Sequence, residues 1–289
     1  MRTGRLQPWL FVGPALILLV FFLLYPSIDT IRLSFLDKRA ENFVGFSNYT
    51  HFFTDKTTLT AFRNNALWVV LFTTFSVSFG LALAVLLDRV RYEKIVKSII
   101  FIPMAISMVG ASTIWKFVYA FRPAGAPQIG LLNAIVTACG GRPMGWLIEM
   151  PWINNLCLIV VGIWINTGFC MVILSAAYKN IPRELMEAAR IDGANEWQVF
   201  RKVILPLLKP TVAVVTTTMV VFVLKIFDIV YVMTNGNFST EVIANRMYKE
   251  MFHFMNFGRS SAIAVILLLL IIPALIINVR RFTEQEAIR

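Results

Sequence analysis

Side chains that could do chemistry are few and widely separated in this sequence. The two histidines, His51 and His253, have no second histidine or cysteine near them, and the three cysteines form no CxxC pair. A zinc-type site needs several such ligands together, so none is expected. No GxxxxGK[ST] phosphate loop is present, and no set of nucleophile, base or paired carboxylates indicates an enzyme. We therefore expect no catalytic residue, metal or cofactor on this chain, and ATP-driven activity would need another polypeptide.

The densest group of charged residues runs from Arg183 to Pro206 and lies between two long apolar segments. Pro182 suits the first turn of a helix, and Gly193 suits the left-handed conformation that ends one. Asn195 followed by Gln198 resembles a capping box, so a second helix is expected to begin there. The stretch is thus predicted to form a helix, turn, helix hairpin that faces water.

The second helix of this hairpin is predicted to have an apolar face. Trp197, Phe200 and Ile204 share that face, whereas Arg201 and Lys202 point elsewhere. An apolar face in a loop needs either a protein partner or the membrane surface, and the pattern alone leaves both open.

The spacing within the hairpin resembles the EAA loop of permease subunits in binding-protein-dependent ABC importers. Glu187-Ala188-Ala189 is followed, at the family's distances, by Gly193 and by Leu205-Pro206, and Val203 stands where the family usually has Ile. The resemblance implies that residues 181–206 hold a coupling helix that docks into a groove of a cytoplasmic ATPase. The residues that it assigns to ATPase coupling are Glu187, Ala188, Ala189, Asp192, Gly193, Ala194, Phe200, Leu205 and Pro206.

The chain as a whole is too apolar for an ordinary soluble domain. Its 289 residues are 58% hydrophobic and 15% charged, and the mean hydropathy is +0.72. The formal net charge of +11 suits a membrane protein with Lys and Arg in its cytoplasmic loops, so no nucleic-acid partner is expected. We expect an all-α polytopic membrane protein in contact with lipid.

Six apolar segments are long enough to cross about 30 Å of hydrocarbon. Lys and Arg are denser on the side that carries the hairpin, so that side and both termini are predicted to be cytoplasmic. Pro14 and Pro26 mark sites for kinks in the first span, and Pro273 marks one in the last. We predict a single permease domain, 1–289, with spans at about 9–31, 64–87, 98–119, 151–178, 207–233 and 260–279.

Short strings along the chain resemble the carbohydrate permeases of the same family, in the same order. One departure is Asn235-Gly236-Asn237, which stands where those permeases usually have Gly-Gly-Pro after a threonine, here Thr234. Asn64-Asn65 stands where they commonly have Asn-Thr. The matching strings are Val44-Gly45-Phe46-Ser47-Asn48-Tyr49, Phe101-Ile102-Pro103, Gly130-Leu131-Leu132-Asn133, Phe227-Asp228 and Tyr231-Val232.

This resemblance implies a type I permease fold with six transmembrane helices in a bacterial inner membrane. The chain would be one of two homologous permease subunits in an importer of α-glucosides, oligosaccharides or related glycosides. The other implied partners are two ATPase subunits, which bind ATP and Mg²⁺, and an extracytoplasmic sugar-binding protein. Import would proceed by alternating access.

Residues that could contact cargo lie in the fourth and fifth predicted spans. Lys225 and Asp228 are three residues apart, and they either form an internal ion pair or border a sugar cavity. Asn166 needs a polar partner in lipid, which is either a neighbouring helix or cargo. By position relative to the EAA loop, the strips that line the path in maltose-type permeases correspond to Gly162, Ile165, Asn166, Phe169, Met219, Val223 and Ile226. Phe169, Phe222 and Phe227 offer faces for a sugar ring.

An ion-coupled secondary transporter, acting without an ATPase, is the alternative. In that case Lys225 and Asp228 would form the ion or proton relay.

Overall fold

The structure is a computed structural model that describes residues 7–149 and 152–287. Within this part the chain is built from helices, and the β-type pairing is a single bridge between Leu36 and Phe43. Five helices are long and apolar enough to cross a membrane, and a bent pair adds a sixth span if it is counted as one. The all-α polytopic fold predicted from the sequence is confirmed.

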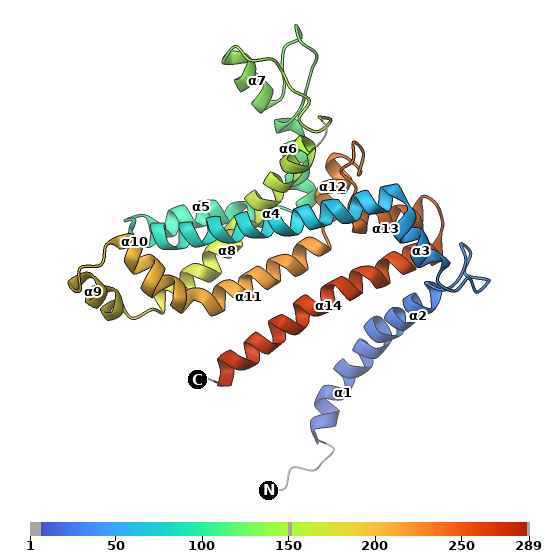
Figure 1. Ribbon diagram of the computed structural model, residues 1–289, viewed down its shortest axis with the longest axis horizontal. Coiled ribbons are helices and arrows are strands. Elements are labelled where there is room, and N and C mark those ends of the chain that lie inside the picture. The colour runs from blue at the N-terminus through green and yellow to red at the C-terminus, as the bar shows by residue number, and fades with distance from the viewer. Residues whose placement is uncertain (1–6, 150–151, 288–289) are drawn as a thin grey trace.

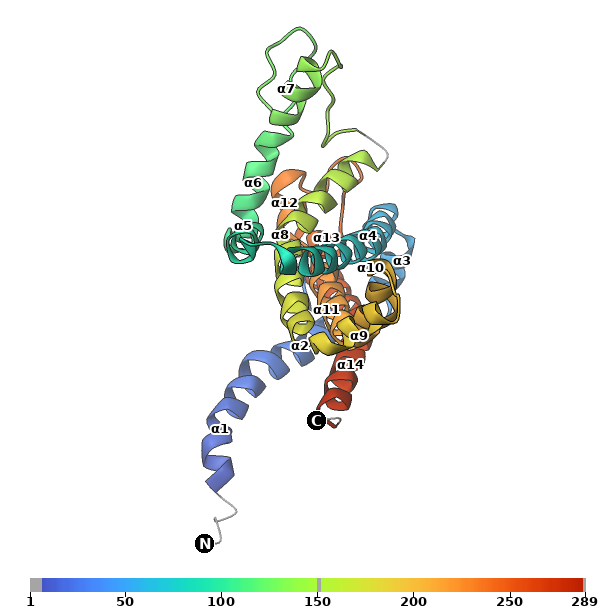
Figure 2. The same ribbon diagram turned by 90° about the vertical axis from the view of Figure 1, so that its left-hand side faces the viewer.

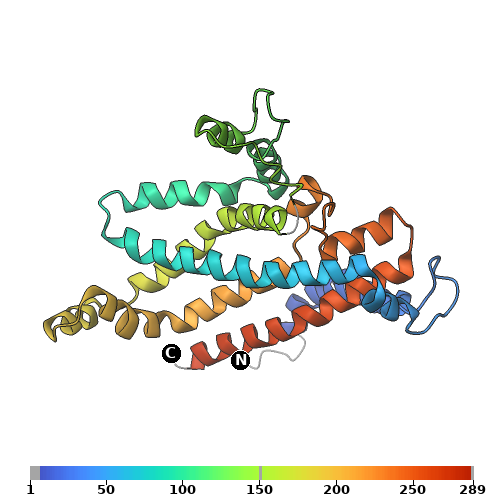
Figure 3. The ribbon, with the colours of Figure 1, turned by 45° about the horizontal axis from the view of Figure 1, so that its top comes forward.

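Four long helices run side by side and form the body of the molecule (Figure 1, Figure 3). Their contact surfaces are apolar, and Trp68, Phe72, Leu158, Ile165 and Val223 are almost completely buried in the central core. The four helices are α4 (Lys56–Leu86), α8 (Ile153–Lys179), α11 (Leu205–Leu224) and α14 (Phe257–Ala287).

The sequence predicts the first span at about 9–31. In the structure, the helix that contains this segment extends away from the body of the molecule (Figure 2). A π-helical turn interrupts it just before Pro26, whose missing N–H cannot continue the regular bonding of the helix. None of its most apolar window is buried, and its main contact is with α14. Its parts are α1 (Gln7–Leu19), η1 (Val20–Leu24) and α2 (Tyr25–Leu33).

The third span, predicted as one helix over 98–119, is broken into two helices bent by 99°. Pro103 lies in the last turn of the first helix, and Ser107 has extended backbone angles and accepts a hydrogen bond from the N–H of Gly110, 3.1 Å away. The serine therefore caps a new helix in a new direction. The two helices are α5 (Glu93–Ala105) and α6 (Met108–Val118).

The fifth span also differs from its prediction of 207–233. The apolar helix that includes α11 begins before the predicted start, at Glu196, and stops at Leu224. After a break of three residues the chain continues in a separate short helix, α12 (Asp228–Met233).

Short helices lie at both ends of the body and in the loops. The hairpin helices α9 and α10 lie at one end, and α3 and α13 lie at the other (Figure 1). The remaining bounds are α3 (Ser47–Thr54), η2 (Leu87–Arg89), α7 (Leu131–Ala138), α9 (Arg183–Ile191), α10 (Glu196–Val199), η3 (Phe200–Ile204) and α13 (Ile243–Phe252).

Candidate functional site

The turn between α9 and α10 is closed by backbone hydrogen bonds around Gly193. The amides of Asp192, Gly193 and Ala194 donate to the carbonyls of Ala188, Arg190 and Ala189 at 2.9 to 3.0 Å. Gly193 has φ +84°, a conformation that a side chain would strain. The predicted helix, turn, helix hairpin is confirmed, with Pro182 one residue before the first turn of α9 rather than within it.

The second helix starts with the predicted capping box. The N–H of Gln198 donates to the Asn195 side chain, and the N–H of Asn195 donates to the Gln198 side chain, each at 2.9 Å. Arg190 and Glu196 form an ion pair at 2.9 Å that joins the two helices. A hydrogen bond to Glu196 raises the pKa of the Arg190 guanidinium. Both side chains are exposed, so this pair contributes little to stability.

One side of the hairpin is attached to the membrane helices. A small core at the ends of α8 and α11 includes Tyr178, Met186, Val199 and Ile204. The predicted apolar face is therefore divided, because Ile204 is buried in the chain's own core while Trp197 is 66% exposed and stacks on Phe200 at 5.6 Å.

The other side of the hairpin is open to a partner. Leu185, Ile191 and Trp197 are exposed apolar side chains there, and Ile191 is 87% exposed. Exposed apolar side chains mark a protein contact where they form a continuous patch. A shallow surface hollow of about 380 Å³ lies at the turn of the hairpin, and its lining includes Ala189, Asp192, Gly193, Ala194, Gln198 and Lys202.

The residues predicted for ATPase coupling lie together on this hairpin. Glu187, Ala188, Asp192, Gly193 and Pro206 are exposed. The others are half-buried, and they are Ala189, Ala194, Phe200 and Leu205.

The two strips predicted to line the substrate path also come together, but as part of the core. Phe222 stacks on Phe72 of α4 at 5.7 Å, and Gly162 faces the Trp68 and Phe72 rings. The strip residues that are buried in this structure are Gly162, Ile165, Asn166, Met219, Val223 and Ile226, while Phe169, Phe222, Phe227 and Asp228 are half-buried and Lys225 is exposed.

Asn166 finds its hydrogen-bond partner in its own helix. Its side-chain Nδ2 donates to the carbonyl of Gly162 at 3.0 Å, so this hydrogen bond stays within α8 and does not reach a neighbouring helix. Thr167 bonds in the same way to Ile163. These bonds within α8 satisfy polar groups that are buried among apolar helices.

The predicted internal ion pair between Lys225 and Asp228 is wrong. Lys225 follows the last residue of α11 and Asp228 begins α12, so the two residues are not on one helix and do not have helical i, i+3 geometry. No ion pair joins them among the described residues. Lys225 and Phe227 instead border a groove of about 430 Å³ beside α13 and α14.

Four buried asparagines, whose role the sequence analysis missed, hold the loop between α12 and α13. Asn64 donates to the carbonyls of Ser239 and Glu241 at 2.7 and 2.8 Å, and Asn154 donates to that of Phe238 at 2.6 Å. Asn155 donates to the carbonyl of Ser239 at 3.3 Å, and Asn65 accepts a hydrogen bond at 2.8 Å from the N–H of Ile243, the first residue of α13. Amides at the ends of apolar spans need partners, and the two Asn-Asn pairs were the signal for this role.

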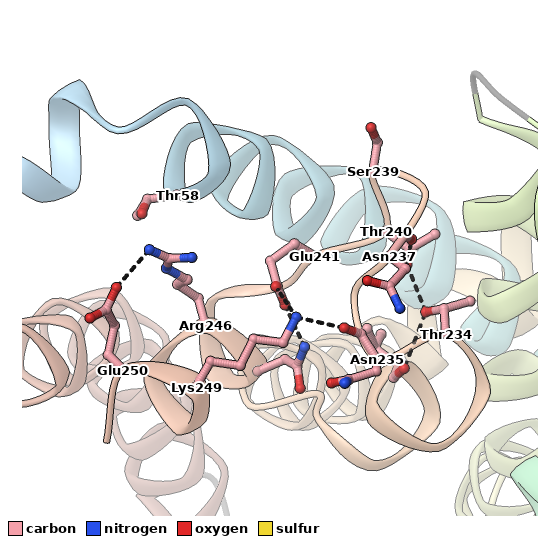
Figure 4. Close-up of polar contacts among 12 residues, drawn as sticks. Thr58, Thr234, Asn235, Asn237, Ser239, Thr240, Glu241, Arg246, Lys249 and Glu250 are labelled. Atoms are coloured by element: carbon pink, nitrogen blue, oxygen red, sulfur yellow. Dashed lines mark hydrogen bonds and ion pairs between the residues drawn. The ribbon is translucent and has the colours of Figure 1, made fainter. Parts of the chain in front are cut away.

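A group of buried charges supports the same loop. Lys249 forms an ion pair with Glu241 at 2.7 Å and donates to the carbonyl of Asn235 at 2.6 Å (Figure 4). Arg246 pairs with Glu250 at 2.6 Å. Glu241 and Glu250 are almost fully buried, and their pairing compensates for the loss of water.

Comparisons with known proteins identify the family. Residues 76–280 match the family described as binding-protein-dependent transport system inner membrane component. The osmoprotective compounds uptake permease protein GgtC of Synechocystis sp. is 62% identical over 97% of this chain and 100% of its own length. The alpha-glucoside transport system permease protein AglF of Rhizobium meliloti is 49% identical over 98% of this chain and 84% of its own.

A solved structure has the same fold. A bacterial ABC transporter involved in the import of the acidic polysaccharide alginate superposes with a TM-score of 0.80, covering 95% of this chain and 96% of that one, at 24% identity. The family match over residues 76–280 and the two sequence relatives confirm the importer family that the EAA spacing resembles. In this family ATP is hydrolysed by a separate subunit. The chain belongs to the binding-protein-dependent ABC importer permeases, the inner membrane components of these transport systems.

Proposed function

We propose that this chain is a permease subunit that imports a carbohydrate, of the class of α-glucosides, oligosaccharides or related glycosides, into the cytoplasm. The observation that carries the proposal is the exposed hairpin with EAA spacing at one end of an apolar bundle. The cargo class rests on the relatives, one of which is named for alpha-glucoside transport and another for uptake of osmoprotective compounds.

The partners proposed are a second, homologous permease, two ATPase subunits that bind ATP and Mg²⁺, and an extracytoplasmic sugar-binding protein. The exposed Leu185, Ile191 and Trp197 supply an apolar surface for the ATPase, and the carboxylates of Glu187 and Asp192 supply acceptors for its basic side chains. Both termini are proposed to be cytoplasmic, because Lys and Arg are denser on the hairpin side.

Import is proposed to occur by alternating access. When the ATPases close on ATP, they move the hairpin, and the hairpin moves α8 and α11, to which its buried core is attached. The proposed path lies where α8 and α11 meet α4. Opening this contact would expose Asn166 and the phenylalanines Phe169 and Phe222 to cargo.

Reconstitution tests this function. The chain is co-expressed with its partners, placed in liposomes and supplied with loaded binding protein and labelled glycosides. Uptake should require ATP, and Asn166→Leu should raise the half-saturation concentration or change the preference among sugars. Uptake by the chain alone, driven by an ion gradient without ATP, would instead support a secondary transporter.

A further inference from the structure

A cavity of about 630 Å³ lies at the end of the fifth span that is away from the hairpin. The last turn of α12, from Tyr231, and the loop that follows it to Phe238 form one wall, and Lys116 of α6 together with Ile148 forms the other. Figure 1 shows α12, which contributes to the lining, at the end of α11 opposite the hairpin, and this end is the one proposed to face the binding protein. The volume of the cavity suits a small organic ligand.

The loop wall has a strained backbone. Asn235, Phe238 and Ser239 all have positive φ, at 51°, 55° and 61°. A bulky side chain such as that of phenylalanine rarely adopts this conformation, and it persists only where surrounding contacts enforce it.

Those contacts come from three other helices. Asn154 of α8 donates to the carbonyl of Phe238, and Asn64 of α4 donates to that of Ser239. Lys249 of α13 donates to the carbonyl of Asn235, a bond that Figure 4 shows. Asn64 and Asn154 are at most 1% exposed. The wall is therefore held in one shape before any ligand arrives, which reduces the entropy cost of binding.

The chemistry of the lining fits a sugar ring. The Phe238 side chain is 46% exposed, and Tyr231 adds a second ring. Asn237 is exposed and offers both an amide donor and an acceptor, and the Lys116 ammonium adds donors. Aromatic faces suit the apolar C–H faces of a pyranose, and amides suit its hydroxyls. No carboxylate is present among the lining residues that the structure describes, which makes this a poor site for a cationic ligand.

We propose that this cavity is an entry subsite that takes a neutral carbohydrate ring released by the binding protein. The inference rests on the proposed carbohydrate import. Tyr231 stacks at 5.0 Å on Phe227, one of the rings predicted to face the sugar, and Phe227 borders the groove beside α13 and α14. The sugar would pass from Phe238 and Asn237 past Tyr231 to the break after α11.

The direct test is photolabelling of the complete reconstituted complex with a diazirine-bearing glycoside, followed by peptide mapping. Label is expected in residues 231–238, and an excess of unlabelled glycoside should remove it. Phe238→Leu and Asn237→Ala should each reduce both labelling and the uptake rate at limiting sugar by about fivefold. Phe254→Leu is the matched control, since Phe254 is a similarly exposed ring that does not line the cavity, and it should leave both unchanged.

The outcomes separate the two proposals. Normal glycoside uptake with no label at 231–238, or with Phe238→Leu behaving as Phe254→Leu does, overturns the entry subsite alone. A photoreactive residue placed at position 238 that captures the binding protein equally with and without sugar also overturns it, in favour of a docking surface. A wild-type complex that imports no glycoside overturns the proposed function and the subsite together.

Discussion

Asp55 links the start of α4 to the outer helix α13. Its carboxylate accepts hydrogen bonds from the backbone N–H and the hydroxyl of Thr58, at 2.8 and 2.7 Å, and lies 3.8 Å from Arg246. Burial opposes ionisation, but the bonds from Thr58 and the charge of Arg246 outweigh it, so the pKa of Asp55 is lowered. Its stabilising effect is therefore complete above the ordinary pKa of an aspartate and is lost as pH falls through the lowered value.

Two substitutions at Asp55 should distinguish the contribution of its helix-capping hydrogen bond to stability from the contribution of its negative charge. Asp55→Ala should lower the free energy of unfolding by about 1 kcal/mol, because the helix loses its cap. Asp55→Asn keeps an acceptor oxygen but cannot titrate. It should therefore lower the free energy of unfolding less than Asp55→Ala does, and its stability should depend less on pH in the acid range than that of the wild type. Thermal unfolding of the purified protein from about pH 3 to about pH 7 measures both effects. Parallel curves for wild type and Asp55→Asn would contradict this account.

Asn64 is a second residue whose effect can be isolated. Replacing it with leucine keeps the volume similar but removes both hydrogen bonds to the carbonyls of Ser239 and Glu241. We expect the free energy of unfolding to fall by about 2 kcal/mol, because a buried carbonyl is left without a partner. Thr57→Val, an exposed position on the same helix, is the control and should change the unfolding temperature little. Equal effects from the two substitutions would exclude a specific role for the amide.

At the scale of elements, the hairpin depends on its turn. A Cβ at Gly193 would meet no atom within 4 Å, so a substitution there acts through the backbone conformation and the partner surface, not through a clash within the chain. Gly193→Asp should abolish uptake while expression remains normal, since it strains the turn and adds a charge where the ATPase is proposed to dock.

Gly125 provides the matched control for that experiment. It also has a positive φ, +92°, with nothing within 4 Å of a Cβ, but it lies in the loop after α6, far from the hairpin in sequence. Gly125→Asp carries the same backbone strain and the same charge, and it should retain uptake. ATP hydrolysis by the complex is measured in parallel. Normal uptake and normal stimulated hydrolysis in Gly193→Asp would remove the hairpin from the coupling step.

At the scale of the whole molecule, the bundle depends on close helix crossings, and Gly168 lies at one of them. A Cβ at Gly168 of α8 would lie 2.6 Å from the carbonyl oxygen of Ile100, so α5 can rest on α8 only where that side chain is absent. Gly168→Ala should destabilise the fold by about 1 to 3 kcal/mol, because the helices must separate. Gly13→Ala, at a helical glycine with open space around it, is the control and should be neutral or slightly stabilising. Thermal unfolding measures the stability of both variants. Equal unfolding temperatures for Gly168→Ala and Gly13→Ala would contradict a close contact between α5 and α8 at Gly168.

The sequence alone determined the features that depend on neighbouring residues. Long apolar runs predicted the membrane helices, and Gly193 with the Asn195 and Gln198 pair predicted the hairpin, because span length, caps and left-handed turns are local properties. The spacing from Glu187 to Pro206 was enough to indicate the family.

Only the tertiary structure decided the features that depend on distant residues. Asn64 binds the carbonyl of Ser239, 175 residues away, and no local pattern specifies that partner. Local hydropathy also did not reveal the breaks after Ala105 and Leu224, because both halves of each span are apolar and only packing sets their directions. Lys225 and Asp228 were therefore assigned to one helix from their spacing, although the chain turns between them.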